Sequence, residues 1–309
     1  MSEKPRNIPA SIHARLTKEA RKSNRPFSEV LQYYGIERFL YRLFQTKYKE
    51  DFILKGGLLI YSWGISMRRP TRDIDFLSLT GNQVELISNV ITDAISLSVP
   101  EDGINFDTSS LSIEETQVDA DRTGIRVRLT GYLARARIPL QIDIGFSDEL
   151  SSTPVVVNYP VVLNDMSGFQ VNSYPAEMVV AEKFHTIERY AALPSRWKDY
   201  YDLWLISERF RMDDQSLRNA ISKTFEKRAT KIPEGRPVSL SDEFINKYHG
   251  NWEIFLKKSG LQVNITGDLK AVVEQIRSFL EKPLQELKSS DIKRFNWQWS
   301  PEAKKWKKI

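Results

Sequence analysis

The apolar residues of this chain follow two different spacings, and the change between them divides the chain near residue 170. Before that point, apolar and polar residues alternate in several short segments, which is the pattern of strands with one buried face. These predicted strands cover residues 73–77, 125–130, 140–146 and 155–163. After Pro175, which suits the first turn of a helix, the spacing is helical almost to the end. The predicted helices there cover residues 176–192, 197–209, 214–229, 241–258 and 266–280.

Helical spacing also occurs in the first part of the chain, over residues 8–50 and 83–98. The strands 125–130 and 140–146 follow each other closely, so we expect a hairpin with its turn between Arg135 and Pro139. The fold class is therefore α+β. We predict an α+β domain over residues 1–170, with helices before its sheet, and a mostly helical domain over residues 171–309.

The composition excludes several kinds of chemistry. The chain has 309 residues, enough for two domains, and no cysteine, which excludes disulfides and thiol nucleophiles. Its three histidines lie far apart in sequence and form no zinc motif. No apolar run approaches the roughly 18 residues of a membrane span, and no signal-peptide stretch follows the charged N-terminus. We therefore expect a cytoplasmic protein without a membrane segment.

The formal net charge of +5 is distributed unevenly. Residues 1–50 contain 11 Lys/Arg and 5 Asp/Glu, and residues 282–309 contain 8 and 3, so the residues between them have a net charge of −6. Basic ends beside an acidic centre suit a polyanion held near a cation site. Charged residues on solvated helix faces would produce the same counts.

Three aspartates lie on the polar side of predicted strands. Asp73 and Asp75 are two residues apart, so their side chains share a face, and Asp143 lies likewise on its own strand. If the two strands are neighbours, three carboxylates converge, and carboxylates without thiol or imidazole partners favour Mg²⁺ or Mn²⁺. The alternative is a set of carboxylates that simply face water.

A pair of glycines precedes these strands and bears on phosphate binding. Gly56 and Gly57 follow Lys55 at the start of a predicted helix, where backbone N–H groups can approach a phosphate. Two glycines alone are a weak signal. The signal is stronger here because the segment 69–76, Arg-Pro-Thr-Arg-Asp-Ile-Asp-Phe, adds guanidinium groups and the carboxylate pair.

Together these residues resemble a known superfamily. Gly-Gly followed by Arg-x-Thr-x-Asp-Ile-Asp-Phe looks like the first signature of the DNA polymerase β-like nucleotidyltransferases. The segments 181–185 and 196–203 resemble the helical signatures of the AbiEii group of bacterial toxins, which includes the MenT nucleotidyltransferases of type IV toxin–antitoxin pairs. One departure is Gly57, which stands where many nucleotidyltransferases have serine. The resemblance implies a polymerase β-like mixed sheet with flanking helices, followed by a helical domain.

The resemblance also implies roles for individual residues. Asp73 and Asp75 would hold the Mg²⁺ or Mn²⁺ ions, Asp143 would be the third carboxylate, and Asp143 could accept the proton of the attacking hydroxyl. The nucleoside triphosphate would contact the residues that the signature places around its phosphates, namely Gly56, Gly57, Arg69, Thr71, Arg72 and Lys183. Asp202 would complete the site.

Spacing alone leaves other interpretations of the helical residues open. Lys183 lies at the border of a predicted buried stripe and could be an ordinary solvated lysine. Asp202 is four residues after Lys198 and could form a surface ion pair with it, while Asp199 and Asp202 share one helix face. We interpret His185 as a residue at the edge of the core.

The expected reaction transfers a nucleotidyl group from a nucleoside triphosphate to a hydroxyl. The toxin resemblance implies an RNA acceptor, most of all tRNA, and an antitoxin encoded nearby that need not touch this protein. The segment 297–308 interleaves tryptophans with lysines, which suits RNA binding or, alternatively, packing of the C-terminal segment onto the body. Two rival functions remain: nucleotidylation of a protein side chain, and RNA binding without catalysis.

Overall fold

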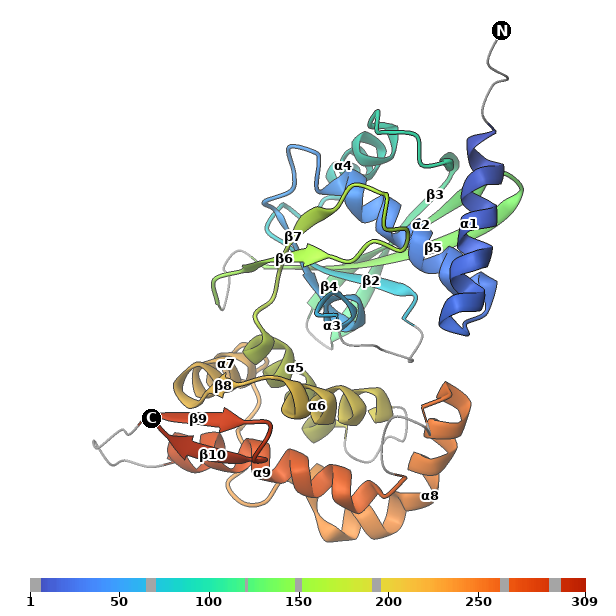
Figure 1. Ribbon diagram of the computed structural model, residues 1–309. Coiled ribbons are helices and arrows are strands. Elements are labelled where there is room, and N and C mark those ends of the chain that lie inside the picture. The colour runs from blue at the N-terminus through green and yellow to red at the C-terminus, as the bar shows by residue number, and fades with distance from the viewer. Residues whose placement is uncertain are drawn as a thin grey trace, which may run out of the picture. The chain divides into compact units, whose positions relative to one another are not determined.

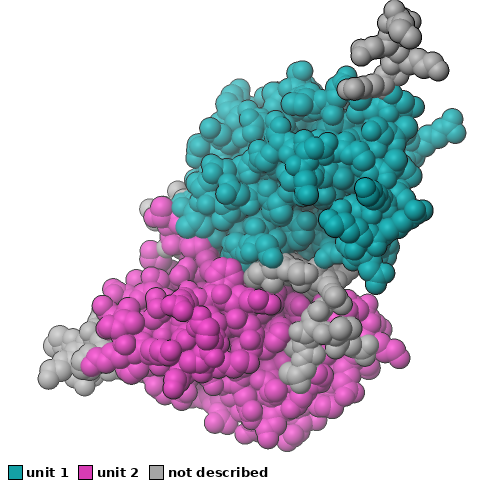
Figure 2. Space-filling model, viewed as in Figure 1, with its two compact units in different colours: residues 1–150, 154–174 teal, residues 151–153, 175–309 magenta. Residues whose placement is uncertain are grey.

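Strands and helices mix in the first half of the computed structural model, whereas helices dominate the second half. The structure describes residues 7–64, 71–119, 122–147, 152–190, 196–261, 267–288 and 296–309. Two units each have a core of their own: unit 1 comprises residues 1–150 and 154–174, and unit 2 comprises residues 151–153 and 175–309 (Figure 2). The predicted α+β class is confirmed.

Unit 1 is built around a mixed sheet whose seven described strands have the order β3-β4-β5-β2-β1-β7-β6 (Figure 1). β2 and β5 are parallel neighbours inside this sheet, although β3 and β4 lie between them in the sequence. The strands are β1 (Phe52–Lys55), β2 (Asp73–Ser78), β3 (Ile104–Asp119), β4 (Arg122–Leu133), β5 (Ala136–Phe146), β6 (Val155–Tyr159) and β7 (Phe169–Ser173). The helices are α1 (Ile8–Ser23), α2 (Phe27–Leu43), α3 (Gly56–Ser62) and α4 (Val84–Ser96).

One face of the sheet is apolar and is covered by α2 (Figure 1). Phe44, directly after α2, contacts Phe76 of β2 with 6.2 Å between ring centroids. Gly35 within α2 lies so close to β5 that a Cβ there would be 2.4 Å from Ile138 Cγ2. The paired strands contribute buried apolar residues to this face, among them Ile74, Phe76, Ile142 and Ile144. The alternation of apolar and polar residues in the sequence therefore predicts correctly which face of these strands is buried in the core.

The predicted hairpin is present, but its turn is tighter and earlier than expected. β4 ends at Leu133 and β5 begins at Ala136, so the turn consists of Ala134 and Arg135 rather than a longer segment reaching Pro139. Ala134 adopts a positive φ of 53°, as a two-residue hairpin turn requires. The position of this turn sets which residues of the two strands face each other.

Unit 2 consists mainly of helices; four lie within three residues of their predicted bounds, and the last runs eight residues beyond its predicted end at residue 280. They are α5 (Ala176–Arg189), α6 (Trp197–Arg209), α7 (Asp214–Lys227), α8 (Asp242–Ser259) and α9 (Leu269–Lys288), with a short 3₁₀ turn, η2, at Val238–Leu240. Large side chains fill the core, including the fully buried Phe184, Phe225, Trp252 and Phe279. Among the described residues, we find no helix that combines the length and the apolar character needed to cross a membrane.

Polar side chains begin two of these helices and a glycine ends one. The Asp213 carboxylate accepts from the N–H of Ser216 at the start of α7, and the Ser241 hydroxyl accepts from that of Phe244 at the start of α8. Gly260 ends α8 in the left-handed conformation, with φ 65°. Local capping thus explains why these helices start and stop where they do.

A small sheet in unit 2 was not predicted from the sequence. Its order is β10-β9-β8, formed by β8 (Met212–Asp213), β9 (Trp297–Ser300) and β10 (Lys305–Lys308). Trp299 is fully buried; its ring lies 5.1 Å from that of Phe279, and its indole N–H donates to the Ser207 carbonyl over 2.7 Å. Trp306 donates to the Phe279 carbonyl. The C-terminal segment therefore packs onto α9 and α6, and Trp299 offers no face on which a base could stack.

Candidate active site

Asp75 and Asp143 lie directly beside each other in the sheet of unit 1. They are Cα partners in the parallel pair of β2 and β5, and Asp73 lies on the same face, paired with Gln141. Residues opposite each other on neighbouring strands have Cβ atoms about 5 Å apart. The structure thus brings the three aspartates onto one face of two central strands.

A row of charged residues crosses the sheet at this level. In register, Lys55 faces Asp75, Asp75 faces Asp143, Asp143 faces Arg126, and Arg126 faces Glu114. Asp75 and Asp143 are both negative and repel each other, but each has a cation as its other neighbour, Lys55 for Asp75 and Arg126 for Asp143. The two central carboxylates are therefore flanked by one cation on each side rather than forming an isolated acidic patch.

Arg126 binds Asp143 through two hydrogen bonds. Its Nε donates to Oδ1 over 2.6 Å and its Nη2 donates to Oδ2 over 3.0 Å, and the Gln141 amide donates to Oδ2 over 3.2 Å. The bond to Asp143 is the main reason that the pKa of Arg126 is raised, and the charge of Asp73 adds to this effect. The pair is partly open to solvent, with side-chain exposures of 33% for Arg126 and 27% for Asp143.

Gly56 gives the Asp75 carboxylate its space. It follows β1 and begins α3 with φ 68°, a conformation that L side chains rarely adopt. A Cβ at this position would be 2.0 Å from Asp75 Oδ2. The first glycine of the Gly-Gly pair is therefore required both by the backbone and by the neighbouring carboxylate. Gly57 is buried in the same helix.

The segment before β2 is held by α2. The buried Thr71 donates its backbone N–H to the Tyr33 hydroxyl over 3.1 Å. Tyr33 stacks on Tyr61 of α3, with 4.8 Å between ring centroids. This contact anchors the chain two residues before Asp73. Arg72 is exposed, and Arg69 lies outside the described residues.

The three aspartates have the type of ligand atom that a divalent cation prefers, but their side chains do not converge on one point. In the part of the chain that the structure describes, no three His, Asp or Glu side chains form a group that could hold a metal ion. The Arg126 guanidinium engages both oxygens of Asp143 and so takes the place of a cation there. Three aspartates on adjacent strands supply the hard oxygen donors that Mg²⁺ and Mn²⁺ prefer. The donor set therefore fits such an ion.

Lys183 and Asp202 belong to unit 2, where they form a buried ion cluster. Lys183 Nζ lies 2.6 Å from Asp202 Oδ2 and 2.9 Å from Asp199 Oδ1. The side chain of Asp202 is fully buried, and those of Lys183 and Asp199 are 12% and 14% exposed. The interpretation of Lys183 as a solvated lysine is wrong, and the partner of Asp202 is Lys183 of α5 rather than a surface pair with Lys198.

His185 is a buried core residue rather than one at the edge of the core. It is buried in α5, and its Nε2 lies 2.9 Å from the Thr230 hydroxyl. Its ring packs edge-on against Phe225 with 5.0 Å between centroids. These contacts account for the histidine without a catalytic role.

Sequence reasoning missed two residues that act on the aspartates. Arg126 lies on the polar side of its predicted strand, so the alternation contained its signal, but the misplaced turn hid its pairing with Asp143. Tyr33 had no signal in the sequence, because its contact with Thr71 joins a helix to a loop 38 residues away.

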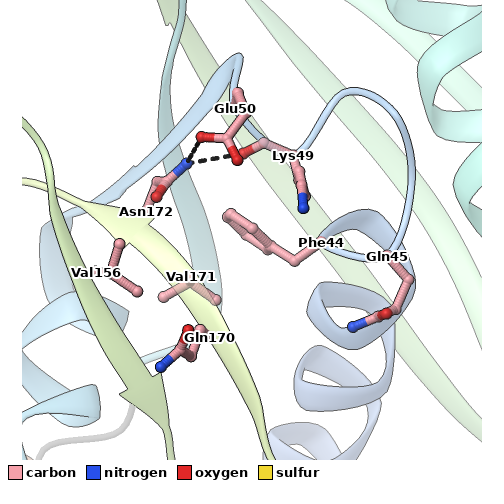
Figure 3. A pocket seen from close by; sticks show the side chains of 8 residues that line it. All are labelled: Phe44, Gln45, Lys49, Glu50, Val156, Gln170, Val171 and Asn172. Atoms are coloured by element: carbon pink, nitrogen blue, oxygen red, sulfur yellow. Dashed lines mark hydrogen bonds between the residues drawn. The ribbon is translucent and has the colours of Figure 1, made fainter.

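A pocket of about 290 Å³ also lies in unit 1, beside β6 and β7 (Figure 3). The Asn172 amide donates to Glu50 and to the Lys49 carbonyl at its rim. The lining residues are Phe44, Gln45, Lys49, Glu50, Val156, Gln170, Val171 and Asn172. None of the three aspartates lines this pocket.

Comparison with known proteins identifies the family. The model of the nucleotidyl transferase AbiEii toxin family, of the type IV toxin–antitoxin system, matches residues 38–296. This chain belongs to the AbiEii family. It is therefore a nucleotidyltransferase and a toxin of that system, which implies an antitoxin partner and a nucleotide substrate.

Two solved structures resemble this AbiEii protein over most of its length. A candidate nucleotidyltransferase from H. pylori is 15% identical, covers 82% of this chain and 92% of its own, and superposes with a TM-score of 0.46. JHP933 from Helicobacter pylori is also 15% identical, covers 84% of this chain and 96% of its own, and has a TM-score of 0.44. A search of curated proteins finds no match.

Proposed function

We propose that this AbiEii protein uses Mg²⁺ or Mn²⁺ to transfer a nucleoside monophosphate from a nucleoside triphosphate to a hydroxyl of RNA, with tRNA as the acceptor. The observation that carries the proposal is the placement of Asp75 and Asp143 as direct neighbours, with Asp73 on the same face. Two adjacent central strands can present these side chains with little freedom, as a metal-dependent transfer requires.

The three aspartates would hold the metal. A bound divalent ion lowers the pKa of the acceptor hydroxyl and offsets charge on the triphosphate. Asp143 would accept the proton of the attacking hydroxyl, once its oxygens are released from Arg126. Gly56 would keep the space that Asp75 needs, and Tyr33 would keep the preceding segment in place.

The triphosphate would be bound by cationic and backbone groups. Arg72 is exposed next to Asp73, and its guanidinium can reach a phosphate oxygen. The backbone N–H groups at Gly56 and Gly57, together with Arg69 and Thr71, remain predicted contacts. That Lys183 contacts the phosphates also remains a prediction; its ammonium is bonded to Asp199 and Asp202.

Charge supports a nucleic acid as the acceptor. Lys305, Lys307 and Lys308 are exposed on β10, in a segment with an excess of positive charge. Phosphate contacts of this kind make binding weaker as salt rises. Because Trp299 is buried, the contribution of this segment would come from its lysines rather than from stacking.

The test is to incubate the purified protein with each α-labelled nucleoside triphosphate, Mg²⁺ and total bacterial RNA. We expect the label to appear in tRNA, to be released by ribonuclease and to resist protease. The Asp75→Asn variant should produce no label. A label that protease removes would instead support nucleotidylation of a protein. Absence of label in any macromolecule would contradict the proposal.

A further inference from the structure

Arg126 is bonded to the carboxylate of Asp143, which the proposed function assigns as a metal ligand. Both oxygens of Asp143 accept from its guanidinium, over 2.6 and 3.0 Å. An ion that took Asp143 as a ligand would need at least one of these oxygens. Arg126 and a metal therefore compete for the same atoms.

We propose that Arg126 is a built-in competitor for the metal at Asp143: its guanidinium holds the carboxylate in the metal-free protein and withdraws when a divalent cation binds. Arg126 thereby sets the metal concentration at which the site fills. The inference rests on the proposed function, because it takes Asp143 to be a metal ligand. Arg126 is a positioning residue in this scheme.

The exposure of the pair permits the exchange. Arg126 is 33% exposed and Asp143 is 27% exposed, so water and salt weaken the attraction between them. A fully buried pair could not open without leaving a charge in an apolar environment. This pair can open into solvent.

Arg126 also has a second carboxylate within its row. Glu114 of β3 is its register partner on the side away from Asp143, and Glu114 is 46% exposed. At present Glu114 accepts from Arg128 over 2.6 Å, diagonally across the strands. When Asp143 takes a metal, Arg126 can turn to Glu114, so its charge stays balanced.

A fixed supporting role for Arg126 would have the opposite consequence. If the guanidinium stayed on Asp143 and oriented it toward the metal, its removal would weaken metal binding. If it competes, its removal strengthens metal binding. The sign of the change in affinity therefore separates the two roles.

The experiment titrates Mn²⁺ alone, without nucleotide, into the full chain and measures binding by calorimetry. We expect Arg126→Met to increase Mn²⁺ affinity about three- to fivefold, the upper part of the range for losing a partly exposed competing ion pair. Arg137→Met is the matched control: it removes the same charge from an exposed position on the same face of β5, six residues before Asp143, and its affinity should stay within about twofold of wild type. Arg126→Lys keeps the charge but loses the two-bond geometry, and it should give an intermediate gain.

Repeating the measurement in an Asp143→Asn protein shows whether the effect of Arg126 acts through Asp143. In Asp143→Asn, Arg126→Met should leave Mn²⁺ affinity unchanged, because the competed ligand is gone. Unchanged or weaker binding by Arg126→Met, or an equal gain in Arg137→Met, would overturn the inference. If Asp75→Asn itself bound Mn²⁺ as tightly as wild type, the proposed metal site would fail instead. A loss in Asp75→Asn without a gain in Arg126→Met would contradict only the role of Arg126.

Discussion

Two ion clusters of similar chemistry occur in this protein, and they differ in burial. In unit 1, Arg126 and Asp143 meet on the face of a sheet, where roughly a third of each side chain is exposed. In unit 2, Lys183 lies between Asp199 and a fully buried Asp202. The first pair can exchange its partner for a ligand or for solvent. The second is expensive to break, because a buried charge would lose its counter-ion.

A cation next to a carboxylate can therefore serve two purposes. Where water reaches the pair, a metal ion or another ligand can replace the cation at the carboxylate. Where water is excluded, the cation fixes a geometry. The following predictions test whether burial decides between these purposes.

The largest expected effect is on catalysis. Asp75→Asn should reduce nucleotidyl transfer at least about a thousandfold, since it removes a proposed metal ligand worth several kcal/mol at the transition state. The free energy of unfolding should change little, because the Asp75 side chain is only partly buried and lies on the polar face of the sheet. Glu85→Gln, an exposed carboxylate on α4, is the control and should keep full activity. Near wild-type labelling by Asp75→Asn would contradict the metal assignment.

The next effect is on the stability of unit 2. Lys183→Met should lower the free energy of unfolding by about 3 kcal/mol, because it removes the ammonium that balances the fully buried Asp202. The double variant Lys183→Met/Asp202→Asn should recover most of this loss, as measured by denaturant titration. Arg126→Met in unit 1 should cost less than about 1 kcal/mol, as expected for a partly exposed pair.

Lys198→Met serves as the control for that measurement, since Lys198 is exposed on the helix that contains both aspartates. Equal losses in Lys183→Met and Arg126→Met would show that burial does not distinguish the clusters.

A smaller effect concerns the space beside Asp75. Gly56→Ala should cost about 2 kcal/mol of stability and reduce transfer, because the residue has φ 68° and its Cβ would collide with the Asp75 carboxylate. Gly64→Ala is a matched control: Gly64 has φ 69°, and no atom of the described residues lies within 4 Å of its Cβ position. It should show only the backbone cost, about 1 kcal/mol, and keep its activity. Loss of activity in both variants would mean that the collision with Asp75 is not the cause.

The smallest effect extends the comparison to a buried carboxylate within unit 1. Burial is the main cause that raises the pKa of Glu37 from its ordinary value to about 7, although Arg38 and the N–H of Val162 oppose it. Between about pH 4.5 and 7 the folded protein then binds a proton more tightly than the unfolded chain does, so stability falls as pH rises through this range. We expect Glu37→Gln to flatten this dependence, by an amount on the order of 1 kcal/mol.

Denaturant titrations of wild type and Glu37→Gln at about pH 5 and about pH 7.5 measure the difference. Glu85→Gln, exposed on α4, should keep the wild-type slope. If Glu37→Gln also kept the wild-type pH dependence of stability, Glu37 would not be the group responsible for it.

Much of unit 1 and nearly all helices of unit 2 could be predicted from the sequence, because period and alternation report which side of an element is buried. The alternation placed Asp75 and Asp143 on the polar sides of their strands. It could not fix their register with β4, because that depends on where the hairpin turns. With the turn at Ala134 and Arg135, residues equally far from it face each other, and Arg126 meets Asp143.

Other elements lacked a local signal. β3 lies at the edge of the sheet, has many exposed polar residues and contains a register shift between Asp107 and Ser112, all of which obscure the alternation. The short β9 and β10 contain tryptophan and lysine in a segment that the sequence presents as basic and aromatic. Only the tertiary contact of Trp299 with Phe279 decides that this segment packs. Residue types alone cannot distinguish such packing from binding.

The parallel pairing of β2 with β5 affects the order in which parts of the protein fold. β3, β4 and β5 are joined by consecutive antiparallel contacts, and such hairpins can form early because their loops are short. β2 must find β5 across the whole of that meander, with Asp75 and Asp143 more than 60 residues apart in sequence. Long-range parallel contacts form slowly, so we expect the two aspartates to come together among the last events of folding. A partly folded chain of this toxin would then lack the proposed reaction centre and be harmless to the cell that makes it, because the aspartates meet only when the sheet is complete.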